Sequence, residues 1–300
     1  MDTATDGTTI KLMAGNYGTL YIRQNENSEI VWTGHGGGKL GGHTNGRKRI
    51  LKNVTITGEK GVNVDRIIVE GGKFSSSNMH SNSATNPVLD SYIELVNFTV
   101  ENINFNVNNF AAIHVLNNGQ TNIKGLTIKN CTVVGSGDAS NTAERVFFGG
   151  VNPITYKDLN GVEIMTTEWS DIKLANCKVS DVHQVIELRN ITNLDIVNNN
   201  FQNIRQRDIL LAGTSADSGA IKGEINITGN TSDGSTERFL RASVVLGNIT
   251  VSDNAITNWA GTDDDFIKIS NATGTIRGTN NTYDGTVVEL TDGVCLKPAI

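Results

Sequence analysis

The sequence predicts a single all-β domain built as a solenoid of stacked coils. Two observations carry this prediction: a short apolar pattern that recurs along the chain, and a composition rich in asparagine, threonine and glycine. Of the 300 residues, 37 are Asn, 32 are Thr and 32 are Gly. These residue types form helices poorly, and Asn and Gly favour tight bends. The composition therefore excludes an ordinary helical domain.

The recurring pattern has apolar residues at its first, third and eighth positions and a small residue at its fifth. Its copies begin 22 to 31 residues apart, except for one step of 46, and they occupy residues 67–74, 98–105, 126–133, 172–179, 194–201, 225–232, 249–256 and 276–283. Each copy is predicted to begin with a strand and to bend at its Gly or Asn, in the left-handed or the bridge region. Asn residues on successive coils are expected to stack their amides in a ladder.

A second short strand is predicted between most copies, so that each coil has two strands. These segments are Ile93–Leu95, Ile113–Val115, Val146–Phe148, Ile186–Leu188, Ile209–Leu211, Leu240–Ala242, Ile267–Ile269 and Val288–Leu290. One coil cannot bury its apolar side alone, whereas stacked coils can. We therefore expect residues 1–300 to form one domain of about nine to eleven coils, with a loop insertion near 149–170.

The repeats, together with the opening segment TTIKLMAGNYGTLYI at 8–22, resemble the right-handed parallel β-helix of pectate-lyase-like proteins. The resemblance implies that fold and an activity towards polysaccharides, as a lyase or a glycoside hydrolase, outside the cell or on a cell or virion surface. Such proteins usually have an amphipathic helix that caps the first coil, and only seven residues precede this opening segment. A capping partner or a homotrimer is therefore expected at the N-terminal end.

Charge and hydropathy limit the other partners. The net charge of −6 and the pI near 5.4 disfavour nucleic acid. No stretch approaches 18 apolar residues, so no membrane span is expected. Residues 2–9 are polar, and no signal peptide is visible.

Function is expected on the outward side of the second strand, because packing occupies the interior. Strict alternation places one charged surface there, with aromatic residues between the charges and with Trp169 overhanging it from the insertion. Charges interleaved with aromatic rings suit an extended sugar chain, although charges on a solvated sheet face also pair across coils. The predicted surface comprises Tyr92, Glu94, His114, Arg145, Glu187, Arg189, Asp208, Phe239, Arg241, Phe266 and Lys268.

Two catalytic interpretations use different members of this surface. Glu187 and Asp208, with Cα atoms about 8 Å apart on the diagonal, fit the acid and base of an inverting glycosidase, unless they pair with arginines. In a lyase, Arg241 would hold a uronate carboxylate, and Lys268 would act as the base. His114 and Tyr92 are alternative bases.

A cofactor is either absent or calcium. Asp263 and Asp265 precede the Lys268 strand, and clustered carboxylates suit Ca²⁺, although a solvated turn also explains them. Cys131 and Cys177 occupy one repeat position on successive coils, as a disulfide or as stacked free thiols.

The sequence therefore predicts a carbohydrate-active protein that binds or cleaves an extracellular polysaccharide. The alternative is a non-catalytic glycan-recognition module, such as a phage tailspike or a surface adhesin. The two hypotheses differ in whether the outward face carries out chemistry.

Overall fold

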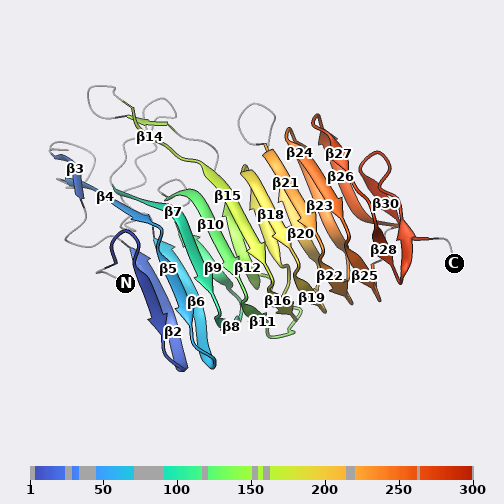
Figure 1. The fold of residues 1–300 in the computed structure, drawn as a ribbon, viewed down its shortest axis with the longest axis horizontal. Coiled ribbons are helices and arrows are strands. Elements are labelled where there is room, and N and C mark those ends of the chain that lie inside the picture. The colour runs from blue at the N-terminus through green and yellow to red at the C-terminus, as the bar shows by residue number, and fades with distance from the viewer. Residues whose placement is uncertain are drawn as a thin grey trace.

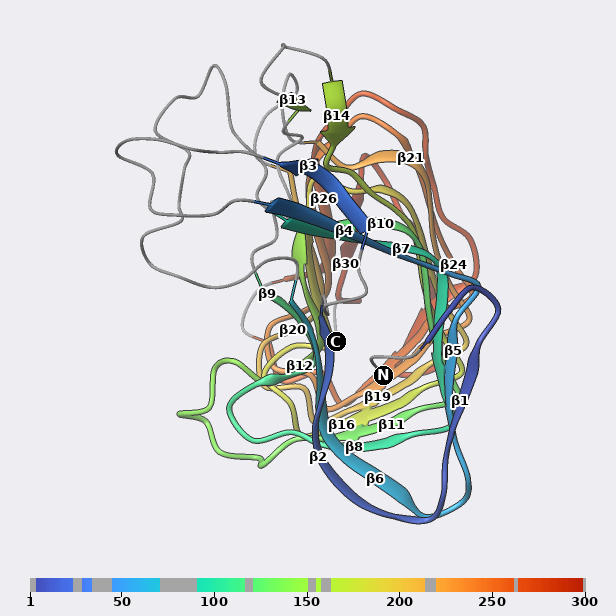
Figure 2. The same cartoon turned by 90° about the vertical axis from the view of Figure 1, so that its left-hand side faces the viewer.

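The computed structural model of the chain describes residues 4–23, 29–33, 45–70, 91–116, 121–150, 155–157, 163–213, 220–261 and 264–298. Their strands lie side by side along one long axis (Figure 1), so the predicted all-β parallel solenoid is confirmed. Three stacks of strands surround the interior of the coil, as the view along the axis shows (Figure 2), and buried apolar side chains form one core there. The described residues include no helix, and hence no apolar helix that could span a membrane.

The first stack holds the long strands on one side of the coil. Its neighbours pair in parallel, except that β3 (Glu29–Thr33) runs antiparallel beside β4 (Asn45–Lys52). Besides β4, its parallel members are β1 (Thr9–Leu12), β5 (Thr55–Gly58), β7 (Ser91–Glu101), β10 (Thr121–Lys129), β15 (Trp169–Ala175), β18 (Thr192–Val197), β21 (Lys222–Thr228), β24 (Asn248–Ser252) and β27 (Ile276–Arg277).

The second stack consists of short strands that close the bottom of the coil in Figure 2. They are β8 (Asn104–Asn106), β11 (Thr132–Val134), β16 (Lys178–Ser180), β19 (Asn200–Gln202), β22 (Thr231–Asp233), β25 (Ala255–Thr257) and β28 (Asn281–Tyr283). The third stack lies opposite the first. It contains β2 (Gly15–Arg23), β6 (Val62–Glu70), β9 (Ala111–Leu116), β12 (Arg145–Gly150), β17 (Ile186–Arg189), β20 (Arg207–Ala212), β23 (Arg238–Val245) and β26 (Asp265–Ala272).

The predicted bend is confirmed, and it lies in the left-handed region. From β7 onward, the chain leaves the first stack through one residue with φ between 53° and 67°, and Asn and Gly tolerate this conformation best. These residues are Asn102, Asn130, Asn176, Asn198, Gly229, Asp253 and Asn280. Each bend turns the chain into a short second-stack strand, so the repeat copies from 98–105 onward each span one corner of the coil.

A ladder of buried asparagines lines the inside of this corner. Asn199, Asn230, Asn254 and Asn281 follow one another on successive coils, and each Nδ2 donates to the next Oδ1 at 2.9 to 3.0 Å. The same Nδ2 atoms also donate to carbonyl groups of the first stack. The buried amides therefore satisfy one another, which confirms the amide stacking that the sequence predicts.

Three details of the predicted coil are wrong. Most coils have three strands, because the short second-stack strand is separate from the third-stack strand. Ile93–Leu95 lies in β7 of the first stack, and the copy at 67–74 begins inside β6 of the third stack. Near the C-terminal end, β29 (Thr286–Val288) and β30 (Val294–Leu296) run antiparallel to β28 and β26. The apolar pattern is the same in all these segments, so pattern alone did not separate them.

The insertion near 149–170 contains an antiparallel strand pair, β13 (Thr155–Lys157) and β14 (Glu163–Thr166). The chain returns from it directly into β15. It therefore lengthens one coil without changing the parallel register of β10 with β15. This accounts for the 46-residue step between two copies of the repeat.

The cysteines are free thiols inside the core. Cys131 and Cys177 are buried on adjacent coils, and their Sγ atoms lie within 3.3 to 3.8 Å of backbone carbonyl oxygens. Cys295 is also buried, and burial raises its pKa to about 11. The disulfide alternative is therefore wrong.

Thiol titration with an aromatic disulfide reagent checks this arrangement. The folded protein is expected to react at none of its 3 cysteines within minutes, because they are buried and the reaction needs the thiolate. All three should react after unfolding in urea without reductant. Reaction of a single thiol in the unfolded protein would show that two of them form a disulfide.

Candidate functional site

The outward side of the third stack carries two rows of side chains. In the central row, strand pairing aligns each member with the next, and the members are His114, Phe148, Glu187, Leu210, Arg241 and Lys268. The corner row lies three residues earlier on the same strands or just before them, and it consists of Arg145, Gln184, Arg207, Arg238 and Asp265. Adjacent members of a row are about 4.8 Å apart, because this is the spacing of paired strands.

Two consecutive buried residues separate the rows on every coil. Examples are Val146 with Phe147, Val185 with Ile186, and Phe239 with Leu240. The chain turns a corner at these pairs, so strict alternation does not hold there. This is why the residues two positions before the central row point inward rather than outward.

Three predicted surface residues are therefore misplaced. Asp208, Phe239 and Phe266 are each 0% exposed and lie inside the coil. Asp208 accepts a hydrogen bond of 2.5 Å from the hydroxyl of Ser232 and a second from that of Ser235. Burial raises the pKa of Asp208 to about 7, and the two hydroxyls only partly offset that rise.

Glu187 stays in the central row but is almost covered, with 6% of its surface exposed. One carboxylate oxygen binds Arg145 at 2.8 Å, and the other binds Arg189 at 2.9 Å. Arg145 is further held by Gln184 and by the ring of Phe148, 5.2 Å from its guanidinium carbon. Glu187 and Asp208 are thus separated by the wall of the coil, and they do not form the acid–base pair of a glycosidase.

The third-stack strands β12, β17, β20, β23 and β26 are strongly basic. They carry six cationic side chains against two outward carboxylates, although the chain as a whole has a net charge of −6. A third carboxylate, Glu237 directly before β23, pairs with Arg207 and Arg238. The cations are Arg145, Arg189, Arg207, Arg238, Arg241 and Lys268, and the carboxylates are Glu187 and Asp265. We call the outward side of these five strands the basic face.

The calcium prediction concerns Asp263 and Asp265, before and at the start of β26, and it stays a prediction. Asp265 binds Arg238 at 2.7 Å and Lys268 at 3.0 Å, so cations already occupy its carboxylate. Asp263 lies outside the described residues. Among those that are described, no three acidic, His or Cys side chains are placed to hold a metal ion.

The remaining predicted site residues lie elsewhere. Glu94 belongs to the first stack, where it pairs with Lys124 at 3.5 Å. Trp169 is 0% exposed: its ring stacks on Phe147, and its Nε1 donates to the Thr121 carbonyl at 2.9 Å. Glycine at position 149 makes room for this ring. Tyr92 lies on β7, with its side chain outside the described part.

Sequence reasoning missed Phe148, Gln184, Arg207 and Arg238 as members of the face. The signal was present, because each third-stack segment contains two adjacent residues that suit the interior, as in the Val-Phe pair at 146–147. Such a doublet marks a corner and shifts the outward positions by one residue.

Two histidines beside the basic face are held neutral. Burial lowers the pKa of His114, and the nearby charge of Arg66 lowers it further. Burial also lowers the pKa of His183, with Arg145 and Arg205 adding to the effect. An unperturbed histidine titrates near pH 6.5, so both side chains are neutral at pH 7.

Comparison with known proteins does not indicate what the basic face binds. The sequence matches no protein-family model and no curated protein.

Proposed function

We propose that the chain is a glycan-recognition module that binds an acidic polysaccharide along the basic face without cleaving it. The observation that supports this proposal is the surplus of cations on five adjacent strands of an acidic protein. A local surplus of this kind attracts and orients a polyanion.

The spacing of the rows suits a chain of repeating carboxylates. Guanidinium groups bind carboxylates in a bidentate manner, and the rows repeat with each strand. Arg241 is the best-placed partner, because it is exposed and makes no ion pair within the described residues. Half-buried Phe148 and Leu210 lie between the charges, where sugar rings can pack on them.

Recognition is favoured over cleavage because three of the five predicted catalytic groups are paired or enclosed. Glu187 is held by two arginines, Asp208 is enclosed, and Lys268 is paired with Asp265. The proposal therefore groups the chain with tailspike-like or adhesin-like modules on a cell or virion surface. Assembly as a trimer or with a capping partner remains a prediction.

Reversing the charge of Arg241 is expected to weaken binding. We expect wild type to bind at least one of hexagalacturonate, hexamannuronate and a hyaluronan hexamer by calorimetry, more weakly as salt rises. Arg241→Glu should raise the Kd by about tenfold or more, since a charge-assisted hydrogen bond contributes about 1.5–3 kcal/mol.

The matched control is Lys178→Glu, which makes the same charge change on exposed β16 of the second stack. It should change the Kd by less than about twofold, because the basic face is untouched. Equal losses in both variants, or no binding of any hexamer by wild type, would contradict the proposal. Release of an unsaturated sugar during the titration would instead favour β-elimination, with neutral His114 as the base.

A further inference from the structure

A row of left-handed residues crosses the first stack, on the side of the coil opposite the basic face (Figure 2). Side chains of this row link neighbouring strands. Asn97 donates to Asn53 at 3.1 Å, and Asn193 donates to Asp171 at 2.8 Å. The first five members of the row are Asn53, Asn97, Gly125, Asp171 and Asn193, all with positive φ, and Gly223 continues the row on β21.

Gly125 is the one of these five without a side chain, and it lies between Asn97 and Asp171 in the strand register. Its φ of 104° disfavours other residues, and a Cβ there would come within 2.9 Å of Asn97 Oδ1 and 3.1 Å of Asn97 N. The glycine therefore interrupts the side-chain row. Asn97 and Asp171 are left two strand spacings apart, about 9.6 Å.

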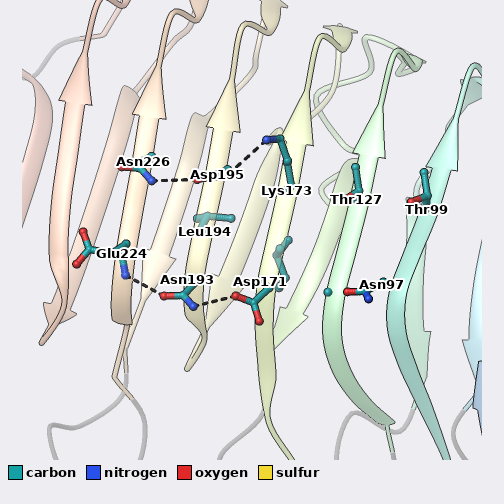
Figure 3. Close-up of a pocket in the computed structure, with 12 residues that line it drawn as sticks. Asn97, Thr99, Thr127, Asp171, Lys173, Asn193, Leu194, Asp195, Glu224 and Asn226 are labelled. Carbon is teal, nitrogen blue, oxygen red and sulfur yellow. Dashed lines mark hydrogen bonds and ion pairs between the residues drawn. The ribbon is translucent and has the colours of Figure 1, made fainter. Parts of the chain in front are cut away.

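The interruption opens into a trough of about 460 Å³ on the outward side of β7, β10, β15, β18 and β21. Figure 3 shows its second row of side chains, one outward position further along each strand. This row consists of Thr99, Thr127, Lys173, Asp195 and Asn226.

The chemistry of the trough is opposite to that of the basic face. Asp171, Asp195 and Glu224 line it against a single cation, Lys173, which lies 3.5 Å from Asp195. Asn193 donates to Asp171 and Asn226 donates to Asp195. Asp171 also accepts from Ser170, and Glu224 accepts from Asn248. A carboxylate has about four acceptor sites, so each of the three keeps further acceptor capacity. The trough is therefore rich in acceptors and negatively charged.

Two threonines supply the remaining hydrogen-bonding groups. The hydroxyls of Thr99 and Thr127 lie beside the gap at Gly125 and bind no other group among the described residues. A hydroxyl both donates and accepts, so it matches the hydroxyl of a sugar. The lining includes no aromatic residue.

We propose that this trough is a second glycan site, selective for an uncharged, hydroxyl-rich oligosaccharide. Sugar hydroxyls donate to Asp171, Asp195 and Glu224, while the threonine hydroxyls exchange hydrogen bonds with a ring seated at Gly125. Three carboxylates repel a uronate, so the two faces of the coil select sugars of different charge. The inference stands independently of the acidic-glycan proposal, because the residues involved do not overlap.

Calorimetry with cellohexaose, maltohexaose and an N-acetylchitohexaose tests the trough. Wild type is expected to bind at least one of them, and Thr127→Val and Asp195→Asn should each raise that Kd about tenfold. Thr127→Val keeps the shape and the β-propensity of the side chain, so folding should be retained. Circular dichroism and the urea midpoint check this.

The matched control is Thr250→Val, which removes a hydroxyl from the same outward row on β24, beyond the trough. Neither this variant nor Arg241→Glu should change the affinity for the uncharged hexamer. The proposal is overturned if wild type binds none of the three sugars, or if Thr250→Val weakens binding as much as Thr127→Val. If a uronate hexamer still binds in that case, only the proposal for the trough is wrong, and the proposal for the basic face stands.

Discussion

Replacing Asn230 with alanine is expected to lower the free energy of unfolding by about 3–6 kcal/mol. The Asn230 amide donates to the Ile196 carbonyl at 2.9 Å and to Asn254 Oδ1 at 3.0 Å. Its Oδ1 accepts from the backbone N and from Nδ2 of Asn199. Alanine would remove these four hydrogen bonds. Asn199 Nδ2 and Asn254 Oδ1 would keep the Leu174 carbonyl and the backbone N of residue 230 as partners. The buried Asn199 N would lose its acceptor, and an orphaned buried group costs about 1–3 kcal/mol.

Urea unfolding followed by circular dichroism measures this loss. Asn200→Ala is the control, because Asn200 is exposed on β19, next to the ladder residue Asn199. It should change stability by no more than about 0.5 kcal/mol. A similar small change for Asn230→Ala would mean that the amide ladder adds little to the fold.

The second large effect concerns pH. Burial raises the pKa of Asp208 from an ordinary carboxyl value to about 7. Between about pH 4 and 7 the folded chain therefore holds a proton that the unfolded chain has released. The contribution of Asp208 to the free energy of unfolding is fully present below about pH 4. It is lost as the pH rises to about 7, a change on the order of 4 kcal/mol. Above pH 7 it changes no further. Asp208→Asn should remove this dependence, because an amide does not titrate.

Urea unfolding at pH 5, 6, 7 and 8 compares the two proteins. Stability of the variant relative to wild type should increase between pH 5 and 7 and then level off. Both share His114 and His183, whose lowered pKa values make stability rise over part of this range, so the difference isolates Asp208. Asp65→Asn, at an exposed position, should behave as wild type. Parallel curves for Asp208→Asn and wild type would show that Asp208 is ionised in the folded protein.

Much of the fold could be predicted because single residues determine its local geometry. The left-handed bend needs Asn, Gly or Asp, so residues such as Asn130 and Asn176 mark one corner directly in the sequence. These bends also predict how the coils align, because residues at the same position of the repeat stack on one another. The division into three strands could not be predicted, since an apolar residue at a corner looks the same as one in a strand.

The candidate site was less predictable, for a related reason. Alternation within one strand predicts the correct face for Glu187, Arg189, Arg241 and Lys268. Arg145 also lies on that face but across the corner, because its alternation partner Phe147 points inward. Asp208, Phe239 and Phe266 were misplaced, because the inward pair at the corner breaks alternation. The trough was missed altogether. It forms where Gly125 has no side chain, and a missing side chain gives no pattern in the sequence.

The register also constrains how a protein of this kind can diversify. The coils of Asn199, Asn230 and Asn254 each add one member to the amide ladder, one to the central row and one to the corner row. Residues 192–221, from the start of β18 to the start of β21, make up one such unit. Tandem duplication of a unit would lengthen both proposed glycan-binding surfaces by one strand while preserving the parallel register. Each added coil would therefore increase two things at once: the length of the solenoid and the length of polymer that it can contact.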